Sequence, residues 1–130
     1  MLGIDFGTKT IGLALSDPSC KIAFPFDNVP IAQSLQHIQR ILDEQPIEKI
    51  ILGKPLNMKG ESTAMTHTVE KFMHQLESIT DIPIEWVDER LSSKLADRSF
   101  ALMGVNTRDR RAKKDASEAA IILQGYLDQR

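Results

Sequence analysis

Three acidic side chains stand where folding could bring them together around a metal ion. Asp5 lies near the end of a predicted first strand, Glu89 follows a later strand, and Asp115 opens the predicted last helix. Carboxylates from separate segments repel one another unless a cation lies between them, and hard oxygen ligands select Mg²⁺ or Mn²⁺. Two such ions can activate water and stabilise the leaving oxygen in phosphodiester cleavage. Asp5, Glu89 and Asp115 are therefore predicted to be catalytic metal ligands.

Two of these acids also have a structural interpretation. Asp5 could accept a hydrogen bond from a turn amide at the end of its strand. Asp88 could cap a following helix, with Glu89 in its first turn, where the helix dipole favours negative charge. Adjacent strand residues face opposite ways, so only one of this pair can join Asp5, and we favour Glu89. If the two strands are parallel neighbours, the acids meet at one edge of the sheet.

The third acid, Asp115, also has a structural interpretation, as part of a helix cap. Asp115 and Glu118 have the spacing of a capping box, which would explain the two residue types. A capping box does not explain why Asp115 lies on the same side of the helix as Ala119 and Ile122, which should face the sheet. A buried carboxylate at a helix start is costly unless a cation meets it. We therefore expect Asp115 to bind the metal, with Glu118 as a further candidate ligand.

The charge of the chain is unevenly distributed. Its 16 Lys and Arg against 18 Asp and Glu give a net charge of −2, which alone argues against a nucleic-acid partner. Residues 90–114, however, hold eight basic and two acidic side chains, a net +6, and leave −8 for the remainder. Such a segment can contact phosphate locally, although a solvated helix surface would look the same. The predicted substrate-binding residues are Lys9, Arg90, Arg108, Arg110, Arg111, Lys113 and Lys114.

The elements that must position these residues follow from the apolar patterns. Strands are predicted over 1–6, 10–16, 21–28, 49–53 and 83–87, helices over 31–45, 61–79, 91–102 and 115–128, and a loop over 103–114. The first two strands form a hairpin, and Pro25 makes the third an edge strand. This order predicts an α/β fold, a mixed sheet with helices on its faces. Ligands of such sheets bind at the carboxyl ends of the parallel strands.

Length and composition set the wider limits. The 130 residues suit one domain spanning 1–130, and the 42% apolar and 26% charged shares are those of an ordinary globular protein. The single Cys20 excludes a disulfide framework and a multi-cysteine zinc site. No apolar run approaches the roughly 20 residues of a membrane span, and the first ten residues do not resemble a signal peptide. We therefore expect a cytoplasmic protein with no membrane partner.

Several motifs, in order along the chain, resemble those of the YqgF (RuvX) family. They are GIDFGTK over 3–9, IGLA over 11–14, GKPLN over 53–57, DERLSS over 88–93, and KD at 114–115 leading into AAIILQ over 119–124. The resemblance implies a ribonuclease H-like fold with a mixed five-stranded sheet and helices on both faces. It also implies a bacterial, cytoplasmic nuclease that matures the 5′ end of the precursor of 16S ribosomal RNA. Pre-rRNA, and with it the ribosomal particle, would be the partners.

The resemblance also bears on the site. The acids of the family map onto Asp5, onto Glu89 with Asp88 as the alternative, and onto Asp115. Related Holliday junction resolvases carry an acid at the end of the fourth strand, about where this chain has Gly53. Glu89 would have to replace that acid from the next strand. Glu118 coincides with a fourth acid of those resolvases, so it is either an extra ligand or a helix cap.

Three other functions stay open on the sequence alone. A junction resolvase acting on branched DNA would be expected to dimerise, but no apolar seam is evident, so we expect a monomer or a weak homodimer. A non-catalytic RNA-binding module would use the same fold, with the acids in structural roles. The segment 5–9 also resembles the phosphate loop of actin-like sugar kinases, which need two such domains, whereas 130 residues supply one.

Overall fold

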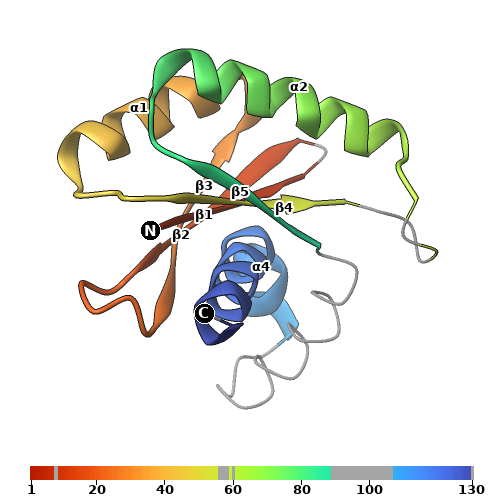
Figure 1. Ribbon diagram of the computed structural model, residues 1–130. Coiled ribbons are helices and arrows are strands. Elements are labelled where there is room, and N and C mark those ends of the chain that lie inside the picture. Colours follow the sequence, from red (N-terminus) through yellow and green to blue (C-terminus); the bar gives the residue numbers. More distant parts are fainter. Residues whose placement is uncertain (8, 56–58, 60, 89–106, 130) are drawn as a thin grey trace.

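The computed structural model describes residues 1–7, 9–55, 59, 61–88 and 107–129, but not the side chains of residues 88 and 107–117. The strands are β1 (Leu2–Phe6), β2 (Thr10–Ser16), β3 (Ala23–Pro30), β4 (Ile50–Lys54) and β5 (Ile84–Asp88). The helices are the 3₁₀ turn η1 (Ile31–Gln33), α1 (Ser34–Glu44), α2 (Ala64–Ile79) and α4 (Thr107–Gln129), as labelled in Figure 1.

The five strands form one sheet in the order β3-β2-β1-β4-β5. The first three strands pair antiparallel, whereas β1, β4 and β5 are parallel. Helices α1 and α2 cover one face of the sheet and α4 covers the other (Figure 1). The structure confirms the predicted α/β fold, a five-stranded mixed sheet with helices on both faces, as expected of a ribonuclease H-like domain.

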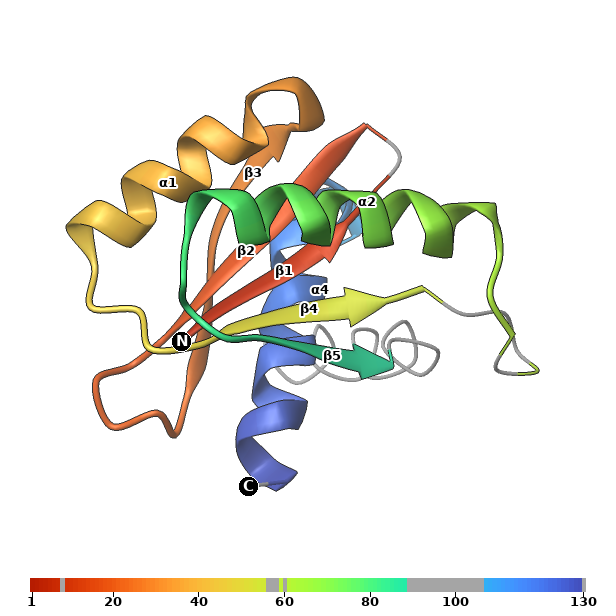
Figure 2. The ribbon, with the colours of Figure 1, turned by 45° about the horizontal axis from the view of Figure 1, so that its top comes forward.

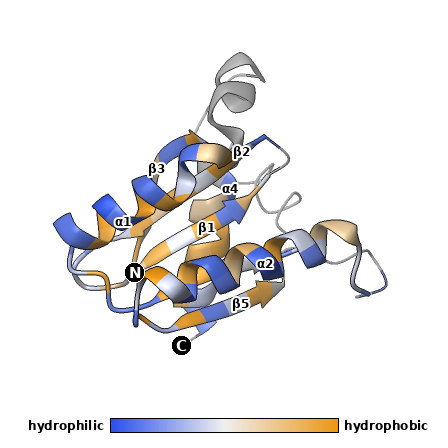
Figure 3. Ribbon diagram, turned by 90° about the horizontal axis from the view of Figure 1, so that it is seen from above, coloured by the Kyte–Doolittle hydropathy of each residue, from blue (hydrophilic) through white to orange (hydrophobic). Residues whose placement is uncertain are grey.

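Strand β1 lies between the two faces of the sheet that the helices cover, and its apolar side chains belong to the core under α1 and α2. Leu2, Ile4 and Phe6 point toward α1 and α2, and their side chains are between 0% and 8% exposed. From above, β1 is visible between these two helices (Figure 3). On the opposite face, Ile51 of β4 packs with α4 residues such as Leu123. Every residue of β1 is buried, because helices cover both faces of this central strand.

Gly3 allows α4 to lie directly on β1. A Cβ atom at this position would come within 2.8 Å of the Cβ of Leu123 and 3.0 Å of the carbonyl oxygen of Ala119. Carbon atoms in contact ordinarily lie about 3.5–4.0 Å apart. The absence of a side chain at Gly3 therefore sets how closely the helix approaches the sheet.

The boundaries of α2 and β3 differ slightly from those predicted from the sequence. Helix α2 begins at Ala64 rather than at residue 61, because Thr63 is its N-cap and forms a reciprocal capping box with Thr66. Strand β3 runs on to Pro30 and lies at the edge of the sheet, as Pro25 predicted. A register shift between Leu13 and Ala14 accommodates the irregular pairing of β3 with β2.

The last helix is the main correction. Helix α4 begins at Thr107, so the loop predicted over 103–114 is wrong for residues 107–114. That stretch is polar, but three Arg, two Lys and one Ala make six of its eight residues strong helix formers, and it contains neither Gly nor Pro. Asp115 therefore lies inside α4 and not at its N-terminus, which overturns the capping-box interpretation. The helix predicted over 91–102 lies outside the described residues.

Candidate active site

Asp5 is the buried carboxylate of the candidate site. It is the next-to-last residue of β1, and it is only 6% exposed. It shares a strand face with Gly3, which is the face that α4 covers, since residues two apart point the same way. A carboxylate is rarely buried to this degree unless it has partners, so the sequence prediction of a special position at Asp5 agrees with its burial.

Glycines flank Asp5 on both neighbouring strands. Asp5 pairs with Gly12 of β2, and the register that pairs Ile4 with Leu52 brings Gly53 beside it on β4. Neither neighbour has a side chain, so a cation or a phosphate oxygen bound beside the carboxylate would meet no side chain at these two positions.

The carboxyl ends of the parallel strands lie at one edge of the sheet. The arrowheads of β1, β4 and β5 point the same way (Figure 2), and Lys54 and Asp88 are paired at the ends of β4 and β5. The expectation that β1 and β5 are parallel is confirmed, but they are not neighbours, because β4 lies between them. Two strand spacings, about 10 Å, therefore separate the backbones of β1, which carries Asp5, and β5, which ends at Asp88.

Strand β5 alternates between the two cores. Val87 packs against the cluster under α4, whereas Ile84 and Trp86 pack against the cluster under α1 and α2. Asp88 ends the strand. Glu89 and Arg90, predicted as a metal ligand and a substrate-binding residue, lie outside the described residues.

Helix α4 runs antiparallel to β1 and carries the third predicted acid toward the same edge. Ala119 and Leu123 lie over Gly3, while Tyr126 reaches Lys49 at the amino end of β4. Going back along the helix therefore leads toward the carboxyl ends of the strands. Asp115 lies one helical turn before Ala119, in the part of α4 that leads toward this edge.

The other predicted residues of the C-terminal half of the chain also lie in α4. Glu118 is half-buried near the middle of the helix, one turn after Asp115. The backbone of the following basic residues is helical rather than part of a loop: Arg108, Arg110, Arg111, Lys113 and Lys114. The structure thus places most of the predicted phosphate-binding residues on the same element as Asp115.

Two contacts fix α4 against the sheet. The Lys49 ammonium donates to the Tyr126 hydroxyl at 2.7 Å and forms an ion pair with Glu85 at 3.3 Å. Hydrogen bonding to Tyr126, and then to Glu85, raises the pKa of Lys49. Hydrogen bonding to Tyr126 and Lys49 lowers the pKa of Glu85. The three polar groups therefore hold the end of α4 to the starts of β4 and β5.

Gln124 makes the second contact. Its side-chain oxygen accepts from the Ala23 amide at 2.9 Å, and its nitrogen donates to the Lys21 carbonyl at 2.9 Å. The amide thus ties α4 to the start of β3. This positioning role was not predicted from the sequence, where its one signal is an amide at the end of the apolar run AAIILQ.

Basic side chains accompany Asp5 at the edge. Lys9, a predicted substrate-binding residue, is exposed in the short connection between β1 and β2. Lys54 ends β4, and its ammonium lies 5.5 Å from the centre of the Trp86 ring. The sequence analysis did not single out Lys54 as a binding residue, although it forms part of the GKPLN motif. Lys54 lies on the α1/α2 face of the sheet with Trp86, whereas Asp5 faces α4, so the two lysines share the strand-end edge with Asp5 but Lys54 lies on the other face.

Within the parts of the chain that the structure describes, no group of three or more His, Cys, Asp or Glu side chains forms a ready metal site. The side chains of Asp115 and Glu89 fall outside those parts. The histidines instead pair with surface carboxylates: His37 with Asp27 at 3.1 Å, His67 with Glu70 at 3.7 Å, and His74 with Glu77 at 3.8 Å. In the same described residues, no helix has the length and apolar character needed to span a membrane.

The sheet order and the acid-bearing edge define an α/β domain of the ribonuclease H-like class. The family model described as "RuvX: Holliday junction resolvase" matches residues 1–129, and the chain belongs to this family. Curated relatives are named "Putative pre-16S rRNA nuclease". The protein of Chlorobaculum tepidum is 39% identical over 98% of this chain and 92% of its own length. The protein of Paramagnetospirillum magneticum is 40% identical over 100% of this chain and 86% of its own length. The protein of Corynebacterium jeikeium is 37% identical over 99% of this chain and 86% of its own length.

Proposed function

We propose that this chain is a metal-dependent nuclease that processes the 5′ end of pre-16S rRNA. The observation that carries the proposal is Asp5, a buried carboxylate flanked by glycines at the carboxyl edge of the sheet, in a chain whose relatives bear the name of that activity. The substrate would be met in the cytoplasm, on the precursor of the small ribosomal particle, by a single domain formed by residues 1–130.

The metal ligands proposed are Asp5, Glu89 and Asp115, with Glu118 as a further one. Glu89 is preferred to Asp88 because adjacent strand residues face opposite ways and Val87, two positions before Glu89, packs on the α4 side that Asp5 faces. Oxygen ligands of this kind suit Mg²⁺ or Mn²⁺, and the glycines beside Asp5 leave room for them. When bound, such ions supply a nucleophilic water and stabilise the leaving oxygen.

The residues of the chain would supply the remaining tasks. Arg108 and Arg111 precede Asp115 by seven and four residues, so the three positions share one face of α4. Guanidinium groups on that face can hold phosphate oxygens on either side of the bond to be cut. Lys9, Arg90, Arg110, Lys113 and Lys114 would contact the flanking backbone. The long α4 would thus carry both Asp115 and the arginines that bind phosphate.

Cleavage of a structured pre-16S fragment tests the proposal. With Mg²⁺ or Mn²⁺, the wild-type protein should cut, and EDTA should abolish cutting. Asp5→Asn and Asp115→Asn should each lower the rate at least 100-fold while retaining the circular dichroism spectrum and RNA binding. The exposed Asp43→Asn, on α1, serves as the matched control. If Asp5→Asn and Asp115→Asn cut like the parent, the acids are not the catalytic centre.

Branched DNA is the second candidate substrate, because the matching family model is described as a Holliday junction resolvase. A resolvase must make two symmetric cuts and would act as a dimer. Light scattering with and without a four-way junction, followed by a cleavage assay on that junction, distinguishes the two substrates. A dimer that cuts junctions but leaves pre-rRNA intact would reverse the assignment.

A further inference from the structure

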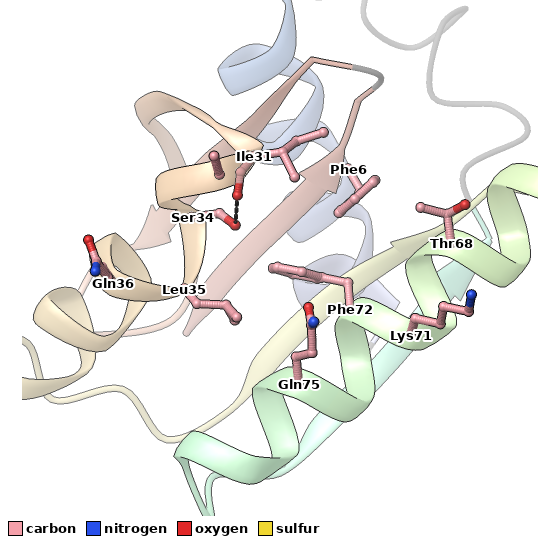
Figure 4. A pocket seen from close by; sticks show the side chains of 10 residues that line it. Phe6, Ile31, Ser34, Leu35, Gln36, Thr68, Lys71, Phe72 and Gln75 are labelled. Carbon is pink, nitrogen blue, oxygen red and sulfur yellow. Dashed lines mark hydrogen bonds between the residues drawn. The ribbon is translucent and has the colours of Figure 1, made fainter.

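A groove lies between η1, α1 and α2, on the opposite face of the sheet from α4 (Figure 4). Its volume is about 470 Å³, within the range of small-molecule sites, which is about 300–1,000 Å³. Phe6 and Phe72 form its floor, with ring centres 5.1 Å apart and planes inclined at 55°. Thr68 and Gln75 extend into it from α2, and Leu35 extends from α1 (Figure 4).

The groove reaches the strand end that carries Asp5, but on the opposite face of the sheet from the Asp5 side chain. Phe6 follows Asp5 directly and points to the other side of the same strand end. The amide of Ile31, on the opposite wall of the groove, donates to the carbonyl of Lys9 at 3.2 Å. The connection that carries Lys9 therefore links the groove to the edge where the scissile phosphate would lie.

The chemistry of the lining favours a nucleotide. Among the described residues, Lys71 is the one charged side chain that lines the groove, and it is a cation. Gln75 offers an amide donor and acceptor at the rim, and it is exposed (Figure 4). An aromatic floor, an amide group at the rim and one ammonium group match the base, the base edge and the phosphate of an unpaired nucleotide.

We infer that this groove binds one unpaired nucleotide of the RNA substrate, next to the position that is cut. The base would enter over Phe6 and Phe72, Gln75 would hydrogen-bond its edge, and Lys71 would contact its phosphate. The inference rests on the proposed function, since it assumes an RNA strand at the edge that holds Asp5. It would make the protein select a cleavage site where a base is free to leave its helix.

Filling the groove tests this directly. Ala32 is exposed in η1 and lines the groove, so Ala32→Trp should occupy the space intended for the base. Gln33→Trp, one residue further on and outside the lining, is the matched control. Ala32→Trp should weaken binding of a single-stranded 12-nucleotide RNA at least about fivefold, the effect of losing one stacked base. Gln33→Trp should bind like the parent.

Lys71→Ala is the second variant, with the exposed Lys21→Ala as its control. Lys71→Ala should lower the slope of log K against log salt for single-strand binding by about 0.7, the value for one phosphate contact.

Binding of a fully paired duplex should not change with Ala32→Trp, because a paired base cannot enter the groove. A photoreactive uridine in the single strand should cross-link to the peptide that contains α2.

The outcomes separate this inference from the proposed function. If Ala32→Trp and Lys71→Ala bind and cut RNA like the parent while Asp5→Asn is inactive, the groove assignment is wrong and the nuclease assignment stands. If Asp5→Asn cuts normally but the groove variants lose single-strand binding, the nuclease site is wrong and the groove stands. A groove that receives a protein segment would leave RNA affinity unaltered in both variants, which would also overturn the inference.

Discussion

Replacing Gly3 by Ala should loosen the contact that joins α4 to the sheet. The added Cβ would meet the Cβ of Leu123 at 2.8 Å and the carbonyl oxygen of Ala119 at 3.0 Å. Neither atom is the end of a flexible side chain, so the helix as a whole must move. Reaching an ordinary contact of 3.4 Å requires a shift of about 0.6 Å along the line to Leu123.

The expected cost follows from overpacking. Inserting a methyl group into a tightly packed core typically lowers the free energy of unfolding by about 1–3 kcal/mol. Urea denaturation monitored by circular dichroism measures this, and the Tm should fall by roughly 3–5 °C for each kcal/mol. Because position 115 lies on the displaced helix, nuclease activity should fall further than the loss of folded protein explains.

Gly125→Ala is the matched control on α4 itself. A Cβ at Gly125 would have no atom within 4 Å, and Ala in a helix is more stable than Gly by about 0.5–1 kcal/mol. The two substitutions add the same methyl group and should change stability in opposite directions. Equal stability of Gly3→Ala and the parent, within about 0.5 kcal/mol, would refute the close approach of α4 to β1.

Three further substitutions test other contacts. Thr63→Ala should cost about 1 kcal/mol by urea denaturation, because α2 loses its N-cap, whereas Thr63→Ser should not. Hydrogen bonds, chiefly from the Ile22 amide, lower the pKa of Asp17 from 3.8 to about 2. The charged form therefore stabilises the fold above pH 3.8, and that stability disappears as pH falls through 2; acid unfolding of Asp17→Asn should show less of this loss. Tyr126→Phe should raise the pKa of Glu85 toward its ordinary value, and an unchanged carboxyl titration by NMR would contradict the contact.

The sequence predicted most elements because their signals are local. The β-branched and aliphatic strands, the apolar stripe of Leu35, Ile38 and Ile41, and the prolines at the breaks each act within a few residues. The start of α4 was missed because its first two turns have charges on every side and no apolar stripe. Its residue types favour a helix, whereas its high polarity is typical of a loop. The structure shows that this stretch is helical and continuous with the helix that contains Asp115.

The sequence also indicated Asp5 as a special position, since a carboxylate inside an apolar strand is costly without partners. It could not place β4 between β1 and β5, because strand order depends on which strands pair across long separations rather than on any one segment. For the same reason the contacts of Gln124 with β3, one hundred residues earlier in the chain, had no local signature beyond a single amide.

The sequence by itself determined the class of fold, the acids available for a metal and the basic stretch available for phosphate. These are properties of residue type and of short-range periodicity. Only the tertiary structure decided that Asp5 is buried between two glycines, that α4 lies against Gly3 and runs toward the same edge, and that a groove opens beside Phe6. Those features arise from packing between elements far apart in the chain, and backbone distances such as the approach at Gly3 exist only once the core has formed.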